Sequence, residues 1–289
     1  MRDVPSGAPS PPITLEIVVP ARNEADRLPE GLATLCAKLR TLPFGCAVIV
    51  VDNGSTDATA AVVRAWRSPI PVRLVQCPPP GKGAAVRAGL LATRAALVGF
   101  CDADMATDLS GLDTALGLLM TGHQVVVGSR ALPASVVQAR SDPLRALGAL
   151  VFRRIVRRMI VDVTDTQCGF KFFAGPIARQ AAASLGSTGF AFDVELLARC
   201  RDLGAAIDEI PVIWRDVPGS SFSVRRHSFT CLRELTTIWR TLRAEHAAAR
   251  RAAGRATSLR VLTVPRQMAS VLPPPLPQPD LPHRVTEPL

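Results

Sequence analysis

Short apolar runs alternate with segments of helical periodicity through the first half of the chain. The runs are rich in Val, Ile and Leu, which is typical of buried strands, and apolar residues recur at helical spacing in the segments between them. The pattern predicts strands at 13–20, 47–52, 72–76, 96–102 and 124–129, and helices at 24–40, 57–66, 81–95 and 109–120. This alternation predicts an α/β fold with a mostly parallel sheet that is covered by helices on both faces.

Polar residues follow each of the five predicted strands. In chain order the clusters are PARNE, DNGSTD, PPPGKG, DAD and GSR. The carboxyl ends of parallel strands meet at one edge of a sheet, and ligands bind beyond that edge in open α/β sheets. We therefore expect the five clusters to converge on a single site.

The two ends of the chain differ in composition from the part between them. Residues 1–12 and 257–289 are rich in Pro and are expected to be disordered, whereas 13–224 should form one folded domain and 225–256 a basic amphipathic helix. The N-terminal segment lacks the apolar core of a signal peptide. The chain also has no run of about 18 apolar residues, the length that is needed to span a bilayer. We expect a cytoplasmic protein without a membrane-spanning segment.

The net charge of +10 is concentrated in two segments. Residues 145–160 contain five Arg and no acid, and residues 225–255 contain eight Arg against Glu234 and Glu245. Such local charge favours an anionic partner, for example a phosphate or a lipid headgroup. Both segments also carry apolar residues near helical spacing, so two interpretations stay open: helices that lie on a membrane surface, and helices that pack on the sheet with Arg in water.

Composition disfavours two other classes of site. Tyr is absent and aromatic residues make up 4% of the chain, so a stacking platform for single-stranded nucleic acid is not expected, and no nucleic-acid-binding motif is present. The seven Cys residues show no C-x-x-C spacing, which argues against a zinc site or a disulfide framework.

The DAD cluster places Asp102 and Asp104 just after an apolar run. Carboxylates two residues apart on an extended segment point to opposite sides, so one could hold a divalent metal while the other reaches a sugar or ribose hydroxyl. A bend would let both approach the metal, and oxygen ligands suit Mg²⁺ or Mn²⁺. The alternative is a polar turn that caps the next helix.

Three further clusters have both a functional and a plain structural interpretation. Asp52 could accept a hydrogen bond from a base N–H, although DNGSTD also forms a tight turn. Lys82 is followed by Gly83, so the P-loop signature is not met, but the start of a helix suits a diphosphate. Arg130, with Arg140 in the following loop, offers guanidinium forks for phosphate oxygens, and the alternative is surface arginine.

Two motifs follow later in the chain. DTQCGFKFF combines polar Asp165, Thr166 and Gln167 with a Gly turn and an apolar strand, and FAFDVELLARC opens a helix with Asp193 and Glu195. Acidic residues in a first turn often only complement the helix dipole. Glu195, between two apolar residues, is expected to support other site residues.

The motifs VVPARNE, VVDNGSTD, GKGAAVRAG, DAD, GSR, DTQCGFK, FDVELL and EIPVIW, in this order, resemble the family 2 glycosyltransferases of GT-A fold. The resemblance is nearest to the polyprenyl-phosphate glycosyltransferases, of the dolichyl-phosphate β-glucosyltransferase type, and covers about residues 13–225. It implies these roles: Pro20, Glu24 and Asp52 for the base and ribose; Lys82 near the nucleotide; Asp102 and Asp104 for the metal and the nucleotide sugar; Arg130 and Arg140 for the acceptor phosphate; Asp165 and Gln167 on the acceptor side.

The reaction expected from this resemblance is an inverting, metal-dependent transfer of a hexose, glucose or mannose, from a UDP- or GDP-sugar to a polyprenyl phosphate. The protein would then lie on the inner face of the membrane, in contact through its basic helices. The alternative is a soluble hydroxyl acceptor, for which Asp165 is the candidate general base. A sugar nucleotidyltransferase is disfavoured because PARNEADRL lacks glycine, and a binding protein without activity would be expected to have lost the metal pair or Arg130.

Overall fold

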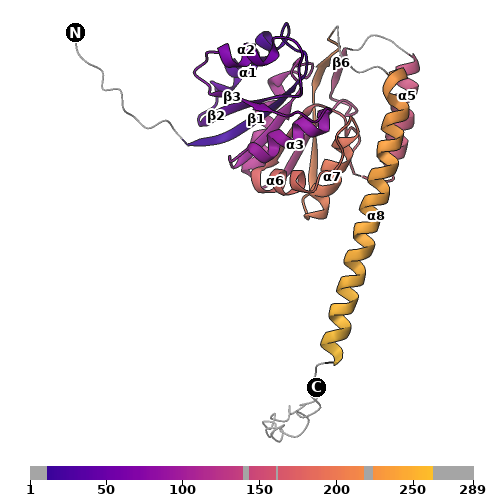
Figure 1. The fold of residues 1–289 in the computed structure, drawn as a ribbon. Coiled ribbons are helices and arrows are strands. Elements are labelled where there is room, and N and C mark those ends of the chain that lie inside the picture. Colours follow the sequence, from indigo (N-terminus) through magenta and orange to yellow (C-terminus); the bar gives the residue numbers. More distant parts are fainter. Residues whose placement is uncertain (1–11, 139–142, 161, 218–223, 263–289) are drawn as a thin grey trace, which may run out of the picture. The chain divides into compact units, whose positions relative to one another are not determined.

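A computed structural model describes residues 12–138, 143–160, 162–217 and 224–262 (Figure 1). The chain divides into one unit of residues 1–240 and a second unit of residues 241–289. The strands are β1 (Ile13–Ala21), β2 (Gly45–Asp52), β3 (Val72–Gln76), β4 (Leu97–Cys101), β5 (Val125–Ser129), β6 (Val136–Gln138), β7 (Phe170–Ala174), β8 (Ile207–Pro211) and β9 (Ile213–Arg215). The helices are α1 (Leu28–Leu39), α2 (Thr59–Ala65), α3 (Lys82–Ala92), the 3₁₀-helix η1 (Leu109–Gly111), α4 (Leu112–Met120), α5 (Pro143–Val156), α6 (Gly175–Ala183), α7 (Phe192–Asp202) and α8 (Val224–Leu262).

Seven strands form one sheet in the order β3-β2-β1-β4-β7-β5-β8. All pairs are parallel except those that β7 makes with β4 and β5. The central strands are apolar on both sides, as a doubly covered sheet requires, and β1 buries Leu15, Ile17, Val18 and Val19 completely. The prediction of a mostly parallel sheet is confirmed. A small parallel pair, β6 with β9, lies outside this sheet and was not predicted.

Helices cover both faces of the sheet. One face packs against α1, α2 and α4, where apolar residues of α1 and α4 meet Phe170 and Phe172 of β7. The other face packs against α3 and α6, and α7 packs on these two helices (Figure 1). The helix α3 approaches β1 and β2 closely at Gly89, because a Cβ there would collide with Val18 and Val51.

The helix α8 buries one apolar stripe and exposes another. Cys231, Leu235 and Ile238 are buried, which fits a helix packed on the protein, whereas Leu232 and Trp239 are 41% and 42% exposed. The helix runs to Leu262, beyond the expected end at 256, and the expected disordered segments fall mostly outside the described residues. Within the described part of the chain, no helix combines the length and the apolar character needed to cross a membrane.

Candidate active site

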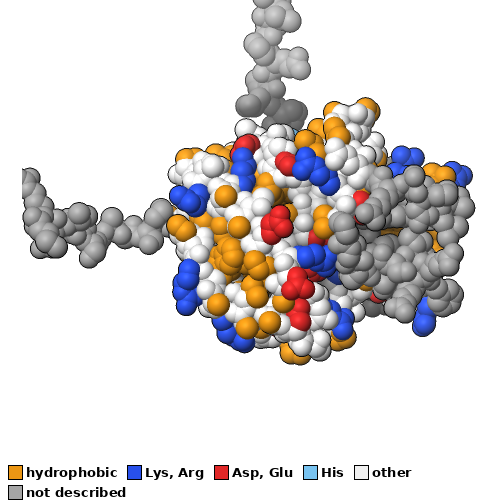
Figure 2. All heavy atoms as spheres, turned by 90° about the horizontal axis from the view of Figure 1, so that it is seen from above, with side chains coloured by type: hydrophobic (Ala, Val, Ile, Leu, Met, Phe, Trp, Pro, Cys, Tyr) orange, Lys and Arg blue, Asp and Glu red, His pale blue; other side chains and the backbone are white. Residues whose placement is uncertain are grey.

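The loops that follow β1, β2 and β3 are hydrogen-bonded to one another. The N–H of Asn23 donates to the hydroxyl of Ser55 over 3.0 Å, and the N–H of Gly81 donates to Oδ1 of Asn53 over 2.8 Å. Asn53 also donates through Nδ2 to the carbonyls of Cys77 and Pro79. Three of the five strand-end clusters therefore lie together. Figure 2, seen from the side on which β6 lies in Figure 1, shows acidic and basic side chains together in the middle of that face.

Three of the expected residues lie at the ends of β1 and β2. Pro20 is half-buried beside Val51, and Asp52 is buried, with Oδ1 accepting from the N–H of Ser55 over 3.0 Å. Glu24, in the loop before α1, pairs with Arg27 at 2.8 Å. Burial raises the pKa of Glu24, and the nearby charges of Asp104 and Asp102 add to that rise.

Asp102 and Asp104 stand on a bend directly after β4. Nζ of Lys82 lies 2.6 Å from Oδ1 of Asp102. Asp104 accepts from the N–H of Ala106 over 3.1 Å, and the N–H of Met105 donates to the carbonyl of Asp102 over 3.1 Å, which closes a turn that contains Asp104. The chain is therefore not extended here, and the alternative in which a bend lets both carboxylates face the same ligand is the better supported one.

The two carboxylates have pKa values that are shifted in opposite directions. Burial alone would raise the pKa of Asp102, but the ammonium of Lys82 outweighs it and the pKa is lowered. Burial raises the pKa of Asp104, and repulsion from ionised Asp102 raises it further. Two neighbouring carboxylates of this kind form a site that a divalent cation would stabilise.

The residues present fit a divalent cation such as Mg²⁺ or Mn²⁺. Two carboxylates supply hard oxygen ligands, and a cation that binds phosphates usually takes only one or two ligands from the protein. Gly169 leaves room for Asp102, because a Cβ at that position would collide with its carboxylate. In the described ranges, no cluster of three or more His, Cys, Asp or Glu side chains offers a metal site made by the protein alone.

Two of the N–H groups at the start of α3 are engaged by a neighbouring loop. The N–H of Gly83 donates to the carbonyl of Gly189 over 3.2 Å, and the N–H of Ala84 donates to the carbonyl of Thr188 over 3.3 Å. Loop carbonyls thus cap the first turn. The ammonium of Lys82 remains as the cationic group of this segment.

Arg130 and Asp165 form a bidentate pair beside β5. Nε and Nη2 of Arg130 donate to Asp165 over 2.7 and 2.9 Å, and the N–H of Arg130 adds a third hydrogen bond of 3.0 Å. Burial would raise the pKa of Asp165, but these bonds outweigh it and hold the pKa at about 2. The guanidinium of Arg130 also lies 5.6 Å from the ring centroid of Trp214, which makes a cation–π contact.

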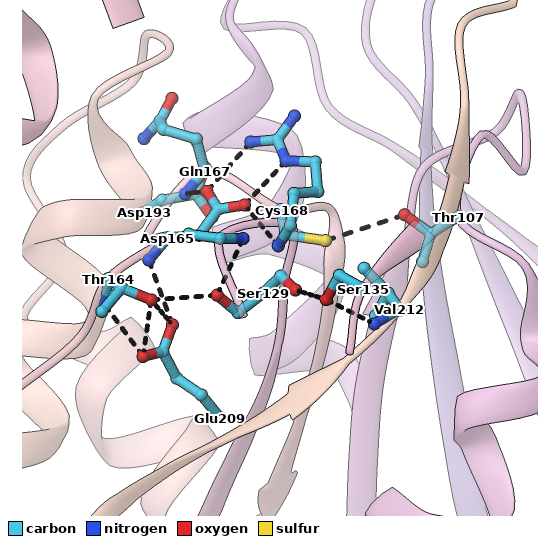
Figure 3. A network of polar contacts seen from close by, with 12 residues as sticks. Thr107, Ser129, Ser135, Thr164, Asp165, Gln167, Cys168, Asp193, Glu209 and Val212 are labelled. Atoms are coloured by element: carbon cyan, nitrogen blue, oxygen red, sulfur yellow. Dashed lines mark hydrogen bonds and ion pairs between the residues drawn. The ribbon is translucent and has the colours of Figure 1, made fainter. Parts of the chain in front are cut away.

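Behind this pair lie supporting residues that were not predicted from the sequence (Figure 3). Glu209 of β8 accepts hydrogen bonds from the N–H and the hydroxyl of Thr164, both at 2.9 Å, and from the N–H of Asp165 at 3.0 Å. The hydroxyl of Thr164 also lies 3.0 Å from that of Ser129. The signal available in the sequence was Glu209 itself, an acid in a strand that follows a buried helix.

The other expected acceptor-side residues have different outcomes. The N–H of Gln167 donates to Oδ1 of Asp165 over 3.1 Å, so the backbone of Gln167 lies beside that carboxylate. Nε2 of Gln167 is buried and has no hydrogen-bond partner among the described residues. Arg140 lies outside the described residues.

A second ion pair, also missed, is buried beneath the site. Nζ of Lys171 lies 2.5 Å from Asp193 and 2.5 Å from the carbonyl of Cys168, and it lies 5.0 Å from the ring centroid of Phe100. Lys171 is fully buried. Asp193 is therefore its counter-ion and does more than complement the dipole of α7. A lysine inside the apolar strand FKFF was the signal, because a buried charge requires a partner.

Comparison with known proteins identifies the family. A family model described as glycosyl transferase family 2 matches residues 16–180. The chain belongs to glycosyl transferase family 2. A dolichyl-phosphate beta-glucosyltransferase of Drosophila melanogaster is 36% identical over 251 residues, which cover 81% of this chain and 77% of the relative. The human protein of the same name is 34% identical over 261 residues, covering 82% and 81%.

Solved structures show the same fold. Glucosyl-3-phosphoglycerate synthase from Mycobacterium tuberculosis, in complex with UDP, aligns with a TM-score of 0.60 and 22% identity over 78% of this chain and 80% of that chain. The complex of the same enzyme with Mn²⁺, UDP and glucosyl-3-phosphoglycerate aligns with a TM-score of 0.57. This family 2 chain therefore has the GT-A fold predicted from its motifs.

Proposed function

We propose that this chain transfers a hexose from a nucleotide sugar to a polyprenyl phosphate of the dolichyl type, with glucose as the first candidate for the hexose. The names of the relatives support both the sugar and the lipid acceptor. The site supports the same reaction, because it combines a carboxylate pair suited to a cation–diphosphate complex with an arginine suited to a second phosphate.

The donor occupies the side of the site formed by β1, β2 and β4. Pro20, Glu24 and Asp52 hold the base and ribose, and Asp102 with Asp104 holds Mg²⁺ or Mn²⁺. The cation, when bound, neutralises the charge that grows on the departing diphosphate. Lys82 exchanges its contact with Asp102 for one with the diphosphate.

The acceptor phosphate meets Arg130, with Arg140 as a second cationic group. Asp165 is fixed to Arg130 by three hydrogen bonds, so it orients the guanidinium. An oxygen of the acceptor phosphate forms the new bond to the anomeric carbon, while the bond from that carbon to the diphosphate breaks. The nucleoside diphosphate leaves with the electron pair, and a single displacement of this kind inverts the anomeric centre.

The state of Asp165 is the observation that carries the phosphate acceptor over the hydroxyl acceptor. A hydroxyl nucleophile requires a general base whose pKa lies near the working pH. Asp165 has a pKa of about 2 and its carboxylate is already engaged, so it is a poor base. A phosphate monoester has a second pKa of about 6 and is largely dianionic at neutral pH, so it needs orientation and no base.

The test is an incubation of the full chain with UDP-glucose, UDP-galactose, GDP-glucose and GDP-mannose, each with polyprenyl phosphate and Mg²⁺ or Mn²⁺. Label from one nucleotide sugar, with UDP-glucose as the first candidate, should move to the organic phase, and the Asp104→Asn variant should lower this transfer by about 10³-fold. Label that appears only on an added aqueous hydroxyl acceptor would replace the proposal with the soluble alternative. No transfer under any condition would overturn both.

Membrane contact through the basic helices forms part of this proposal and places the protein on the inner face of the membrane. Arg153, Arg154, Arg157 and Arg158 are exposed at the end of α5 and just after it, and Leu150, Leu232 and Trp239 are exposed apolar residues. Flotation with anionic vesicles should succeed at low salt and fail at high salt. Flotation that is equally absent at both salt concentrations would remove this contact from the proposal.

A further inference from the structure

The loop of residues 186–191, which leads into α7 from the end of α6, lies against the start of α3. Its carbonyls at Thr188 and Gly189 accept the N–H groups of Ala84 and Gly83, as described above. The loop therefore supplies hydrogen-bond partners that a helix cannot supply to its own first turn. Lys82 is the first residue of that turn.

The contact between this loop and α3 leaves no spare room. A Cβ at Gly81 would collide with the carbonyl oxygen of Thr188, and a Cβ at Gly83 would collide with Ser187 and Phe192. Gly81 also has a positive φ of 126°, which other residues rarely adopt. Because Lys82 lies between these two glycines, a shift of the loop would move the backbone that carries Lys82.

The loop is itself held at both ends by carboxylates from helices. Glu195 of α7 accepts from the N–H of Gly186 over 3.1 Å and from the N–H and the hydroxyl of Ser187 over 2.8 and 2.5 Å. At the other end, Oε2 of Glu234 in α8 accepts from the N–H of Ala191 over 3.0 Å. The carboxylate of Glu234 also fills the space that a side chain at Gly189 would need.

Glu234 is one of two acids in the arginine-rich segment 225–255, and the proposed function does not use it. We propose that Glu234 is a positioning residue for Lys82, acting through the 186–191 loop. It fixes the end of the loop whose carbonyls set the first turn of α3, and so it sets where the ammonium of Lys82 stands for a nucleoside diphosphate. The inference rests on the proposed contact between Lys82 and the diphosphate.

The test compares Glu234→Ala, Glu234→Gln and Glu245→Ala in the full chain. Calorimetry measures the affinity for UDP and GDP with Mn²⁺, and kinetics measure KM for the donor and for the acceptor. Glu234→Ala should weaken binding of the nucleoside diphosphate and raise the donor KM about tenfold, while the acceptor KM stays unchanged. A tenfold change is the effect expected when Lys82 loses one charged hydrogen bond to the diphosphate. Glu234→Gln keeps an acceptor oxygen for the N–H of Ala191 and should retain most of the affinity. Glu245→Ala, in the same helix, should have no effect.

Three outcomes are decisive. A lower melting temperature for Glu234→Ala with unchanged nucleotide affinity would reduce Glu234 to a structural residue and overturn the inference, as would an equal rise of both KM values. If Glu234→Ala does not fold, Glu234→Asp replaces it, since the shorter side chain withdraws the acceptor and should raise the donor KM alone. Lys82→Met tests the premise separately. If this variant leaves nucleotide affinity unchanged, the proposed contact between Lys82 and the diphosphate is wrong, whatever Glu234→Ala does.

Discussion

The donor side and the acceptor side of this site differ in how completely their charges are paired. On the donor side, Lys82 and Asp102 share one contact of 2.6 Å, and their side chains are 24% and 33% exposed. On the acceptor side, Arg130 and Asp165 share three hydrogen bonds and are 28% and 8% exposed, so the cations are similar and only the acids differ in exposure. Glu209 also holds the backbone of Asp165. The difference indicates that the donor side is built to exchange partners and the acceptor side to keep them.

The carboxylates record the same difference in their pKa values. Burial raises the pKa of Asp104 and repulsion from Asp102 adds to that rise, so the protein alone does not compensate the charge of Asp104 as it does that of Asp165. Asp165 has its pKa held at about 2 by hydrogen bonds to Arg130, so its charge is already compensated. A preorganised group needs no rearrangement when the substrate binds, which lowers the cost of reaching the transition state.

The largest effect is expected from Asp104→Asn. This change removes a ligand of the cation and should lower transfer by about 10³-fold, which corresponds to about 4 kcal/mol of transition-state stabilisation. The melting temperature should not fall, because the change also removes repulsion between two carboxylates. A rate assay with added Mn²⁺ and a thermal melt of the same sample check both statements. A large loss of stability would show that the fold depends on the donor side as much as on the acceptor side.

The next largest effect should distinguish the Arg130–Asp165 pair from the Lys82–Asp102 pair by what each contributes to the free energy of unfolding. Arg130→Met leaves Asp165 charged and buried without its partner, which should cost about 3 kcal/mol of the free energy of unfolding. Lys82→Met also breaks an ion pair, but the side chain of Asp102 is 33% exposed, so the cost should be smaller, about 1 kcal/mol. Denaturant unfolding of both variants measures the difference. Equal losses of stability in the two variants would contradict the division into a donor side that exchanges partners and an acceptor side that keeps them.

The donor side was more accessible to prediction from sequence than the acceptor side, for a physical reason. Asp52 ends β2, Asp102 and Asp104 come just after β4, and Lys82 opens the helix that follows β3. The topology of a parallel sheet brings such strand ends together whatever the details of packing. The pairing of Arg130 with Asp165 depends on β7, the one antiparallel strand of the large sheet, and on β8, which follows much later in the chain. No local pattern specifies such a contact.

Two partners of buried charges illustrate what remained hidden. Lys171 was visible as a charge in an apolar strand, but its partner Asp193 lies on α7, 22 residues further along the chain. Glu209 was visible only as an acid near the motif EIPVIW, and its bonds to Thr164 and Asp165 require the pairing of β8 with β5. The sequence showed that such charges need partners, and only the fold shows which ones they have.

A smaller effect should appear in the pH dependence of stability. The folded-state pKa of Asp165 is lowered from an ordinary 3.8 to about 2, so its contribution to stability is fully present above pH 4 and is lost as the pH falls towards 2. The shift of nearly two units corresponds to about 2 kcal/mol. Unfolding of the unmodified chain and of Asp165→Asn across this range should show that the variant loses less stability on acidification. Parallel curves for the two proteins would mean that the pair with Arg130 does not hold in solution.

The smallest effect tests how far the rigidity of the acceptor side depends on Trp214. The ring contributes a cation–π contact to Arg130, worth about 0.5–1 kcal/mol, so Trp214→Leu should raise the acceptor KM about two- to fivefold. Trp214→Phe keeps an aromatic face and should recover most of the loss, while the donor KM stays constant in both variants because Lys82 and Asp102 lie on the other side. If Trp214→Leu changes the donor KM instead, the two sides are coupled and the acceptor side cannot be regarded as a separate, preorganised unit. An unchanged acceptor KM would instead show that the fork to Asp165 alone is sufficient to orient Arg130.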